Sequence, residues 1–391
     1  MPIDTFPYPR LGLDKTLAEV RAAMFQQLDE VHAEYQAQGW LPASLNLNRG
    51  PARGMIELIN FGLARVNRDV SALIPQCFPL YATGSWLDLH AAGVLLTRKP
   101  ALQATGQITF TRAQAGGNVK IPAGRLVKTK PDGLGEVYRF VTTVDVVMPE
   151  NALSVAAPVI AEEYGQAANV TAGAICEIVT AIGGVDGVAN SADWLLTEGA
   201  DEEGDESLRT RYVLVWKAVG GLNKYFYESL ALSVPGVIKV FVNDRHPRGQ
   251  GTVDVVIKGA AGIPTESLIS QVAAVIEENR PQIDDVLVLA PAPVGVALDI
   301  ELLITSGDHA AIRLEVENRL RALFMSQADG LNVEPLEIGE DLTHSRIHSE
   351  ALKTAGIKSV IINGPPADLV VPPGGLAVLE SIGVTTMAAE A

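Results

Sequence analysis

Apolar residues recur every three or four positions through the first part of the chain, a spacing that predicts helices. A first helix is expected over residues 14–38, with Asp14 as its N-cap and Gly39 at its end. Its apolar stripe consists of Leu17, Val20, Met24, Leu28, Val31 and Tyr35. The stripe is narrow and the opposite face is polar, which suits a helix of a small helical bundle. An ordinary surface helix packed on its own domain would show the same pattern.

A second helix is expected over residues 52–74, where Pro75 ends it. One of its faces carries Ile56, Ile59, Leu63, Val66, Val70 and Ile74. A short third helix follows Ser85, which can cap it. Residues 1–100 are therefore predicted to form an N-terminal helical region.

The pattern changes at Ala101 to the alternation of apolar and polar residues that predicts strands. Strands are expected at residues 107–112, 119–121, 125–130, 138–148, 154–164 and 175–182. In the first of them, Ile108 and Phe110 lie on one side. Glycine, proline and asparagine turns separate these short runs, which is typical of a small sandwich or barrel-like domain. We therefore expect a central β-rich domain over residues 101–195.

Helices and strands mix in the remaining region, residues 196–391, which predicts an α/β oligomerisation domain. Helices are expected at residues 207–219, 223–234, 265–279 and 310–325, and strands at residues 237–243, 252–258, 286–290 and 294–305. On the first of these helices, Leu208, Tyr212, Val215, Trp216 and Val219 are expected on one face. The predicted fold class is thus multidomain α+β.

The C-terminal region contains an internal repeat. Residues 231–243 align without gaps with residues 351–363, at an offset of 120. Both segments have the order helix, glycine stop and strand, and both are followed by a loop and a second strand. This predicts two related helix-strand-strand halves, about 223–258 and 343–384, that share a sheet or face each other.

The net charge of the chain argues against two classes of binding partner. The chain has a formal charge of -16 and 48% hydrophobic residues. A negative chain gains no counterion release from nucleic-acid phosphates and is repelled by anionic lipids, so neither nucleic acid nor membrane is expected as a partner. No secretion signal is evident at the N-terminus, so synthesis and folding in the cytoplasm are expected. Cys77 and Cys176 are expected to be buried free thiols.

The densest cluster of charge is an acidic elbow between residues 198 and 206. It contains Glu198, Asp201, Glu202, Glu203, Asp205 and Glu206. The spacing does not match an EF-hand calcium loop. A solvated elbow whose Asp205 caps the next helix is the expected alternative. Arg209 and Arg211 follow, so Asp201, Glu202, Asp205, Arg209 and Arg211 are candidates for polar contacts within the chain or between subunits.

Motifs of catalysis are missing from the sequence. His344 and His348 are spaced i, i+4 with Glu350 nearby, but no HExxH motif or third ligand accompanies them. There is also no GxSxG, Walker loop or GxGxxG after a strand. We therefore expect no catalytic, cofactor-binding or metal-binding residues, and no enzyme.

A collinear series of short motifs runs from about residue 80 to residue 305. It comprises Thr83-Gly-Ser-Trp-Leu-Asp88, Val119-Lys-Ile-Pro-Ala-Gly-Arg-Leu-Val127, Tyr138-Arg-Phe-Val-Thr-Thr143, Gly165-Gln-Ala-Ala-Asn-Val-Thr-Ala-Gly173, Gly187-Val-Ala-Asn190, Asp205-Glu-Ser-Leu-Arg-Thr-Arg211, Val234-Pro-Gly-Val237 and Arg280-Pro281. In this series the chain resembles the baseplate J-like family, the baseplate wedge proteins of contractile-tailed phages and related injection systems.

The resemblance implies a structural role in the tail baseplate of a virion. Two copies would share a wedge, and wedges would close a six-fold ring around the central hub and spike. The N-terminal helices would join a helical core bundle with a smaller wedge protein, and the C-terminal region would link neighbouring wedges. A sheath-initiator-like baseplate protein of lysozyme-like fold is a further implied partner. The ring would widen on contraction. The alternatives are a receptor- or glycan-binding tail protein and a metal-dependent hydrolase.

Overall fold

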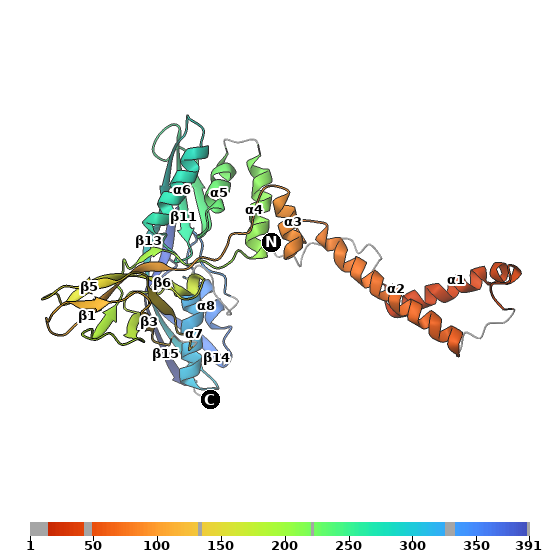
Figure 1. Ribbon diagram of the computed structural model, residues 1–391, viewed down its shortest axis with the longest axis horizontal. Helices are drawn as coiled ribbons and strands as arrows, with labels where there is room; N and C mark the ends of the chain where they lie inside the picture. The colour runs from red at the N-terminus through yellow and green to blue at the C-terminus, as the bar shows by residue number, and fades with distance from the viewer. Residues whose placement is uncertain (1–14, 43–48, 132–134, 220–222, 325–332, 389–391) are drawn as a thin grey trace. The chain divides into compact units, whose positions relative to one another are not determined.

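The computed structural model describes residues 15–42, 49–131, 135–219, 223–324 and 333–388 (Figure 1). It divides into two compact units, Met1–Thr97 with Asp205–Arg209, and Arg98–Gly204 with Thr210–Ala391. The described residues form eight α-helices and fifteen strands. The predicted α+β class is confirmed, with helices first, a barrel-like β region next and an α/β region last.

The first unit begins with α1 (Leu17–Ala37) and α2 (Pro51–Gln76). Thr16 is the N-cap of α1 and forms a capping box with Glu19. The expected N-cap, Asp14, lies outside the described residues. Pro75 does not end α2, because the helix continues through it to Gln76.

Helix α3 (Ser85–Ala92) starts after Gly84, which takes the cap position expected for Ser85. A small core joins α3 to the first turn of α4 (Asp205–Ala218). Its buried residues are Ala82, Leu87, Ala91 and Leu208.

The β region, expected as a sandwich or barrel, contains one nearly closed, barrel-like sheet. Its strands are β1 (Thr105–Thr111), β3 (Leu126–Thr129), β4 (Arg139–Thr142), β6 (Ser154–Ala161), β7 (Ile175–Ile178), β8 (Gly187–Ala189) and β9 (Leu195–Thr197). The order is β7-β3-β4-β6-β1-β8, and β9 also pairs with β1. Separately, β2 (Val119–Ile121) pairs with β5 (Val146–Met148). The single strand expected over 138–148 is therefore two strands, which lie in different sheets.

Asn190 bridges the two ends of this sheet, β8 and β7. Its backbone oxygen accepts a hydrogen bond from Gly173 N, and its side-chain oxygen accepts one from Ile175 N at 3.0 Å. Its amide donates to Thr171 O at 2.9 Å. The domain thus closes through one buried side chain where a strand ladder is missing. Inside, the Phe140 and Trp194 rings meet edge to face.

The C-terminal region contains two three-stranded sheets. The first is β10 (Val237–Asn243), β11 (Thr252–Gly259) and β12 (Asp285–Leu289), and the second is β14 (Ile357–Gly364), β13 (Ala292–Ile304) and β15 (Gly375–Ala388). In each sheet the central strand, β11 or β13, is antiparallel to one neighbour and parallel to the other.

Each antiparallel edge strand follows a short helix, α5 (Lys224–Ser233) before β10 and α8 (His344–Ala351) before β14. Gly236 and Gly356, which are 120 residues apart, share a φ of 92°. This left-handed conformation favours glycine and turns each helix into its strand. The following strands differ, because β11 is central in its sheet and β15 is an edge. The repeated unit is thus a helix-glycine-strand segment, and the domain boundaries stay a prediction.

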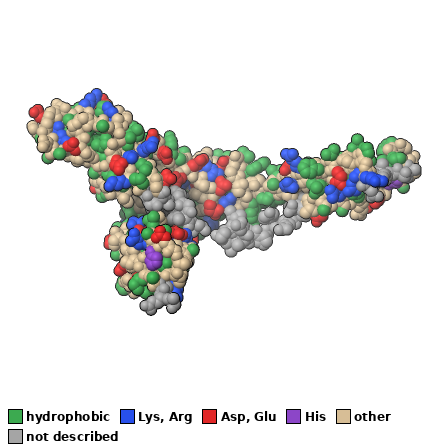
Figure 2. All heavy atoms as spheres, turned by 90° about the horizontal axis from the view of Figure 1, so that it is seen from below, with side chains coloured by type: hydrophobic (Ala, Val, Ile, Leu, Met, Phe, Trp, Pro, Cys, Tyr) green, Lys and Arg blue, Asp and Glu red, His purple; other side chains and the backbone are tan. Residues whose placement is uncertain are grey.

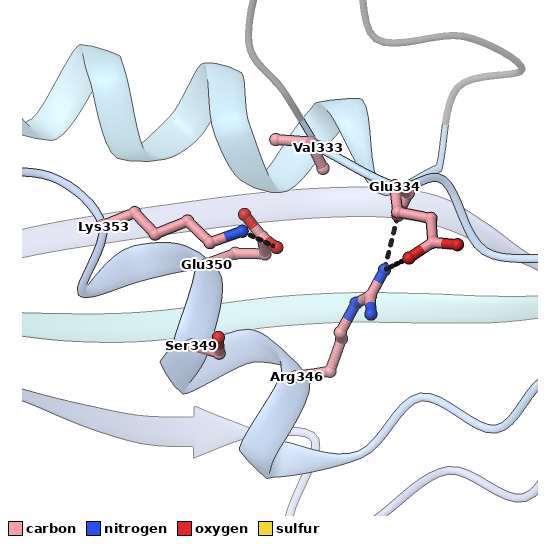
Figure 3. Close-up of a pocket in the computed structure, with 6 residues that line it drawn as sticks. All are labelled: Val333, Glu334, Arg346, Ser349, Glu350 and Lys353. Carbon is pink, nitrogen blue, oxygen red and sulfur yellow. Dashed lines mark hydrogen bonds and ion pairs between the residues drawn. The ribbon is translucent and has the colours of Figure 1, made fainter. Parts of the chain in front are cut away.

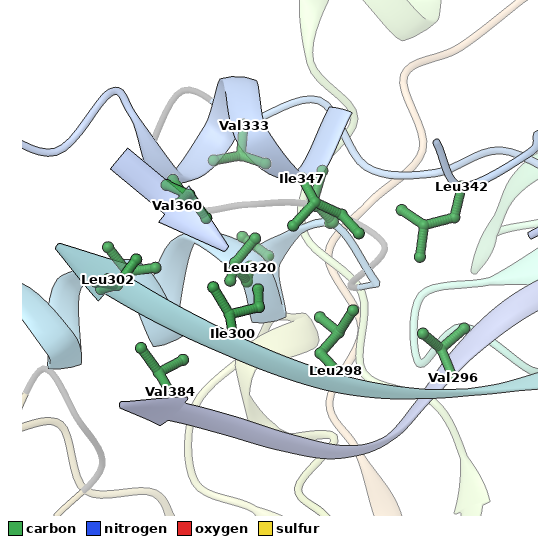
Figure 4. Close-up of a cluster of buried hydrophobic side chains, with 14 of the residues drawn as sticks. Val296, Leu298, Ile300, Leu302, Leu320, Val333, Leu342, Ile347, Val360 and Val384 are labelled. Carbon is green, nitrogen blue, oxygen red and sulfur yellow. The ribbon is translucent and has the colours of Figure 1, made fainter. Parts of the chain in front are cut away.

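Helices cover one face of each sheet. On the first sheet, α5 and α6 (Glu266–Asn279) pack on Val253, Val255 and Ile257. On the second, α7 (His309–Ala322) and α8 pack on the inward side chains of β13. Figure 4 shows part of that core, with Leu298, Ile300 and Leu302 beneath Leu320 and Ile347.

Cys77 is exposed and Cys176 is half-buried, so the expected burial of both thiols is wrong. Cys77 is the C-cap residue of α2. Among the described helices, none is both long and apolar enough to cross a membrane.

Candidate interaction surfaces and the acidic elbow

Helix α2 exposes an apolar seam. Its residues follow the three-four spacing of a coiled coil: Ile56, Ile59, Leu63, Val66, Val70 and Leu73. All except Ile56 are 40–56% exposed. Hydrophobic side chains lie at the surface beside charged ones in the space-filling view (Figure 2). An apolar stripe of this length on an exposed helix is typical of an interaction surface.

The covered face of α2 is polar. Asn60 is fully buried, and its side-chain amide has no hydrogen-bond partner within the described chain. The Glu57 carboxylate forms ion pairs with Arg21 of α1 at 2.9 Å and with Arg53 of α2 at 2.6 Å. The Arg53 guanidinium also lies 4.3 Å from the centre of the Phe25 ring. Ion pairs and a cation–π contact therefore join α1 to α2, while the apolar side of α2 is left exposed.

The predicted bundle stripe on α1 is only partly covered. Leu17 is exposed, Val20 is buried, and Met24, Leu28, Val31 and Tyr35 are half-buried. A half-covered stripe can accept a further helix. Its role in a helical bundle stays a prediction.

Glu198, the first acid of the elbow, is buried and binds backbone amides. Its carboxylate accepts hydrogen bonds from Ala261 N at 3.1 Å and Thr265 N at 2.8 Å. A Cβ at Gly259 would lie 2.3 Å from the same carboxylate, so only glycine permits this approach. Burial raises the pKa of Glu198, although the backbone hydrogen bonds oppose the rise. Glu198 thus fastens the end of the β domain to the loop before α6.

Glu203 forms a buried ion pair with Arg211, with Nη1 2.6 Å from Oε2. The backbone amide of Lys99 also donates to Glu203 Oε2 at 3.0 Å, and the Lys99 ammonium donates to Val237 O at 2.8 Å. One polar cluster therefore ties the segment leading into the β domain to α4 and β10. The expectation of a solvated elbow is wrong at Glu198 and Glu203.

In the first unit, Asp205 and Arg209 bind the segment before α3. Asp205 Oδ2 accepts from Gly84 N at 2.9 Å, and Arg209 donates to Ala82 O at 2.8 Å. The N-cap of α4 is Gly204, so the expected Asp205 cap is wrong. The acids of the first turn are both engaged, since Asp205 binds Gly84 and Glu206 lies 2.7 Å from Arg209.

Asp201 and Glu202 remain exposed on the elbow. Asp201 accepts a hydrogen bond from Gln166 N at 3.1 Å, which holds it beside the Tyr164–Gln166 turn. Arg209 and Arg211, in contrast, are buried and bind within the chain. Contacts with another subunit therefore stay a prediction, and the exposed Asp201 and Glu202 are best placed to make them.

Lys258 is a buried ammonium between two C-terminal subdomains. It lies on β11, and its Nζ donates to Leu336 O at 2.9 Å. Burial lowers its pKa from 10.5 to about 8. Lys99 is lowered to about 8 as well, chiefly by burial.

These lysines predict that the free energy of unfolding rises with pH between about 8 and 10.5. In that window the unfolded chain holds the protons that the folded chain has released, so higher pH favours folding. A Lys258→Met variant should lose about 2 kcal/mol of the rise between about pH 7.5 and about pH 9.5. Urea unfolding of both proteins at the two pH values measures this. Equal pH slopes would contradict it.

A pocket of about 450 Å³ lies beside α8 (Figure 3). Its charged side chains bind one another: Lys353 lies 2.7 Å from Glu350, and Arg346 donates to Glu334 O at 2.7 Å. Arg319 adds a contact to buried Glu350. These contacts hold α8 against the neighbouring segments. The charged residues that line the pocket are therefore explained by the packing of α8.

The two histidines expected at i, i+4 do lie on α8. The His344 ring is 2.8 Å from Pro365 O, and its backbone amide donates to Asp368. Within the described residues, no group of three histidine, cysteine or acidic side chains could hold a metal ion.

Known proteins match this arrangement domain by domain. Residues 107–196 match the Baseplate J-like protein barrel domain, residues 219–290 the Baseplate J-like central domain and residues 296–385 the Baseplate J-like protein C-terminal domain. The chain belongs to the Baseplate J-like family. It is accordingly a structural protein of a tail baseplate, as the sequence motifs predicted.

A relative of this Baseplate J-like chain is the "Putative baseplate protein gp29" of Haemophilus phage HP1 (strain HP1c1), 29% identical over 213 residues. The match spans 54% of this chain and 54% of that protein, so about half the length of the relative is covered. A chain in the structure of the anti-feeding prophage baseplate is 11% identical, with 95% and 99% of the two chains covered. Its TM-score of 0.35 is too low to establish a shared fold.

Proposed function

We propose that this protein is a baseplate wedge subunit. It joins a second copy and a smaller wedge protein through a helical bundle, and wedges close a six-fold ring around the central hub and spike. A sheath-initiator-like protein is a further proposed neighbour. The observation that carries the proposal is the exposed seam of α2. Ile59, Leu63, Val66, Val70 and Leu73 form an apolar stripe that partner helices would cover.

Buried charged contacts join the parts of the second unit, so we propose that this unit moves as a single body when the ring rearranges. Glu198 joins the β domain to the loop before α6, and the Glu203–Arg211 pair with Lys99 joins it to α4 and β10. Lys258 joins the first C-terminal sheet to Leu336. Buried charged contacts of this kind are costly to break one at a time. Rearrangement on contraction is therefore proposed to occur at contacts between chains, and no catalytic step is required.

The α2 seam gives a direct test of the bundle. A Leu63→Glu, Val66→Glu double variant should fold with a stability within about 1 kcal/mol of wild type, because both side chains are exposed. It should fail to form a complex with the smaller wedge protein. Size-exclusion chromatography with light scattering, on the mixed purified proteins, measures this.

The matched control is Arg68→Glu, a charge change at an exposed position of α2 outside the seam. This variant should assemble like wild type. Assembly of the double variant as tightly as wild type would contradict the proposed bundle. So would the lack of any complex between the wild-type chain and its wedge partners.

A further inference from the structure

The second half of α4 and its C-cap residue, Val219, carry a stripe that is half-buried at Tyr212 and exposed at its other two members. Tyr212, Trp216 and Val219 are spaced i, i+4, i+7, and Trp216 and Val219 are 60% and 68% exposed. Leu214, on another side of the helix, is buried, whereas Leu208, on the stripe's own face but nearer the start of the helix, is buried in the small core with Leu87 and Ala91. The sequence pattern had placed Leu208 and Trp216 on one face. An exposed tryptophan on a well-packed helix is informative, because large apolar side chains are rarely left in solvent without a partner.

The start of α5 adds Lys224 and the Tyr225 ring, which lie beside Lys217 of α4. Lys217 Nζ lies 5.4 Å and Lys224 Nζ 5.2 Å from the centre of the Tyr225 ring. The Tyr212 and Trp216 rings meet edge to face at 6.5 Å. Both lysines are exposed. The result is an ordered aromatic–basic patch on a chain whose net charge is -16.

We propose that the aromatic–basic patch (Tyr212, Trp216, Lys217, Val219, Lys224 and Tyr225) docks a second copy of this chain. Tryptophan and tyrosine dominate the binding energy of protein interfaces, and lysines at the rim select an acidic partner. A second copy of the chain carries an acidic surface with an exposed aromatic ring. Tyr164 is 67% exposed and follows two exposed carboxylates, Glu162 and Glu163.

The exposed acids of the elbow extend that surface. The hydrogen bond from Gln166 N to Asp201 places Asp201 beside the Tyr164–Gln166 turn, and Glu202 follows it. This acidic–aromatic surface (Glu162, Glu163, Tyr164, Asp201 and Glu202) is the counterpart of the aromatic–basic patch. It explains what the exposed acids of the elbow do, whereas Glu198 and Glu203 are internal.

The two surfaces are separate on one chain. Tyr212 and Trp216 lie seven and eleven residues after Asp205, where α4 begins, which at 1.5 Å per residue places them about 10 and 16 Å along the helix from its elbow end. A contact between different surfaces of identical chains is heterologous, and such contacts build rings when the rotation closes. The inference therefore deepens the proposed ring-forming function and rests on it. It uses a different surface from the α2 seam, so the two proposals can fail separately.

Charge exchange tests the contact. In a Lys217→Glu, Lys224→Glu variant, self-association of the full chain should weaken by about tenfold or more. A Glu163→Lys, Glu202→Lys variant should weaken it similarly. An equimolar mixture of the two variants should restore association, because each then supplies the charge that the other lacks. Sedimentation velocity over a concentration series, at low and at high salt, measures all three.

Trp216→Ala should weaken self-association by about tenfold or more without changing its salt dependence. Lys358→Glu, at an exposed position on β14, is the matched charge control and should leave association unchanged. The inference is overturned if the wild-type chain stays monomeric at sub-millimolar concentration. It is also overturned if the charge variants associate like wild type, if their mixture restores nothing, or if only a different wedge protein occupies the patch. Loss of the α2-dependent complex alone would instead count against the bundle.

Discussion

Replacing Arg211 by methionine should destabilise the chain by about 3–5 kcal/mol, because it leaves the Glu203 carboxylate buried without its partner. The Glu203 side chain is 1% exposed and that of Arg211 is 7% exposed, so water cannot replace the lost charge. The Lys99 amide still donates to Glu203, and the Lys99 ammonium lies near. These groups keep the loss toward the lower end of the range. Urea unfolding followed by circular dichroism gives the difference in free energy.

A double variant separates the ion pair from simple packing. Glu203→Gln with Arg211→Met removes both charges, and it should recover most of the stability that Arg211→Met loses. Arg313→Met is the surface comparison, since Arg313 makes only a loose, exposed pair with Glu317 at 3.9 Å and should cost less than about 0.5 kcal/mol. If Arg211→Met cost no more than Arg313→Met, the elbow would not be the joint described above.

The sequence pattern predicted where helices and strands lie better than it predicted which of their faces are buried. Strand β10 has the predicted bounds, because its apolar alternation lies between Pro235-Gly236 and a turn-rich loop. Strands β8 and β9 have three residues each and were missed. Runs so short carry no periodicity, and only pairing with β1 makes them strands.

The same limit applies to apolar faces. The repeat of Ile59, Leu63 and Val66 predicts a helix, yet a core and an interface need the same repeat. For α4, the pattern grouped Leu208 with Trp216, although only Leu208 is buried. Tertiary packing decides which side of such a helix is covered, and that information lies in distant residues.

The spacing of residues on α4 gives a weak indication that Arg211 is buried. Arg211 stands three residues after Leu208 and three before Leu214, in phase with the buried side of α4. A charged residue in such a position predicts a buried partner. Its identity could not be predicted, because Glu203 lies eight residues away on the elbow and Lys99 enters from much earlier in the chain.

Arg112 is a second charged residue in phase with a core, since it follows Ile108 and Phe110 at steps of two. It is 7% exposed, and its guanidinium donates to four backbone oxygens. These are Ala152 O at 2.6 Å, Gly117 O at 2.8 Å, Gly116 O at 3.2 Å and Pro149 O at 2.8 Å. One side chain therefore holds two loops of the β domain, residues 113–118 and 149–153, against the end of β1.

Arg112→Met should accordingly cost about 3–5 kcal/mol, because four backbone carbonyls lose their charged donor and methionine cannot replace the guanidinium fork. Arg112→Lys keeps the charge but offers a single ammonium, so an intermediate loss is expected. Arg139→Met is the matched control, because Arg139 is exposed and lies 3.8 Å from Glu162. Urea unfolding measures the losses, and amide exchange should rise in the two loops first. Arg112→Met with wild-type stability and unchanged exchange would show that the loops hold themselves.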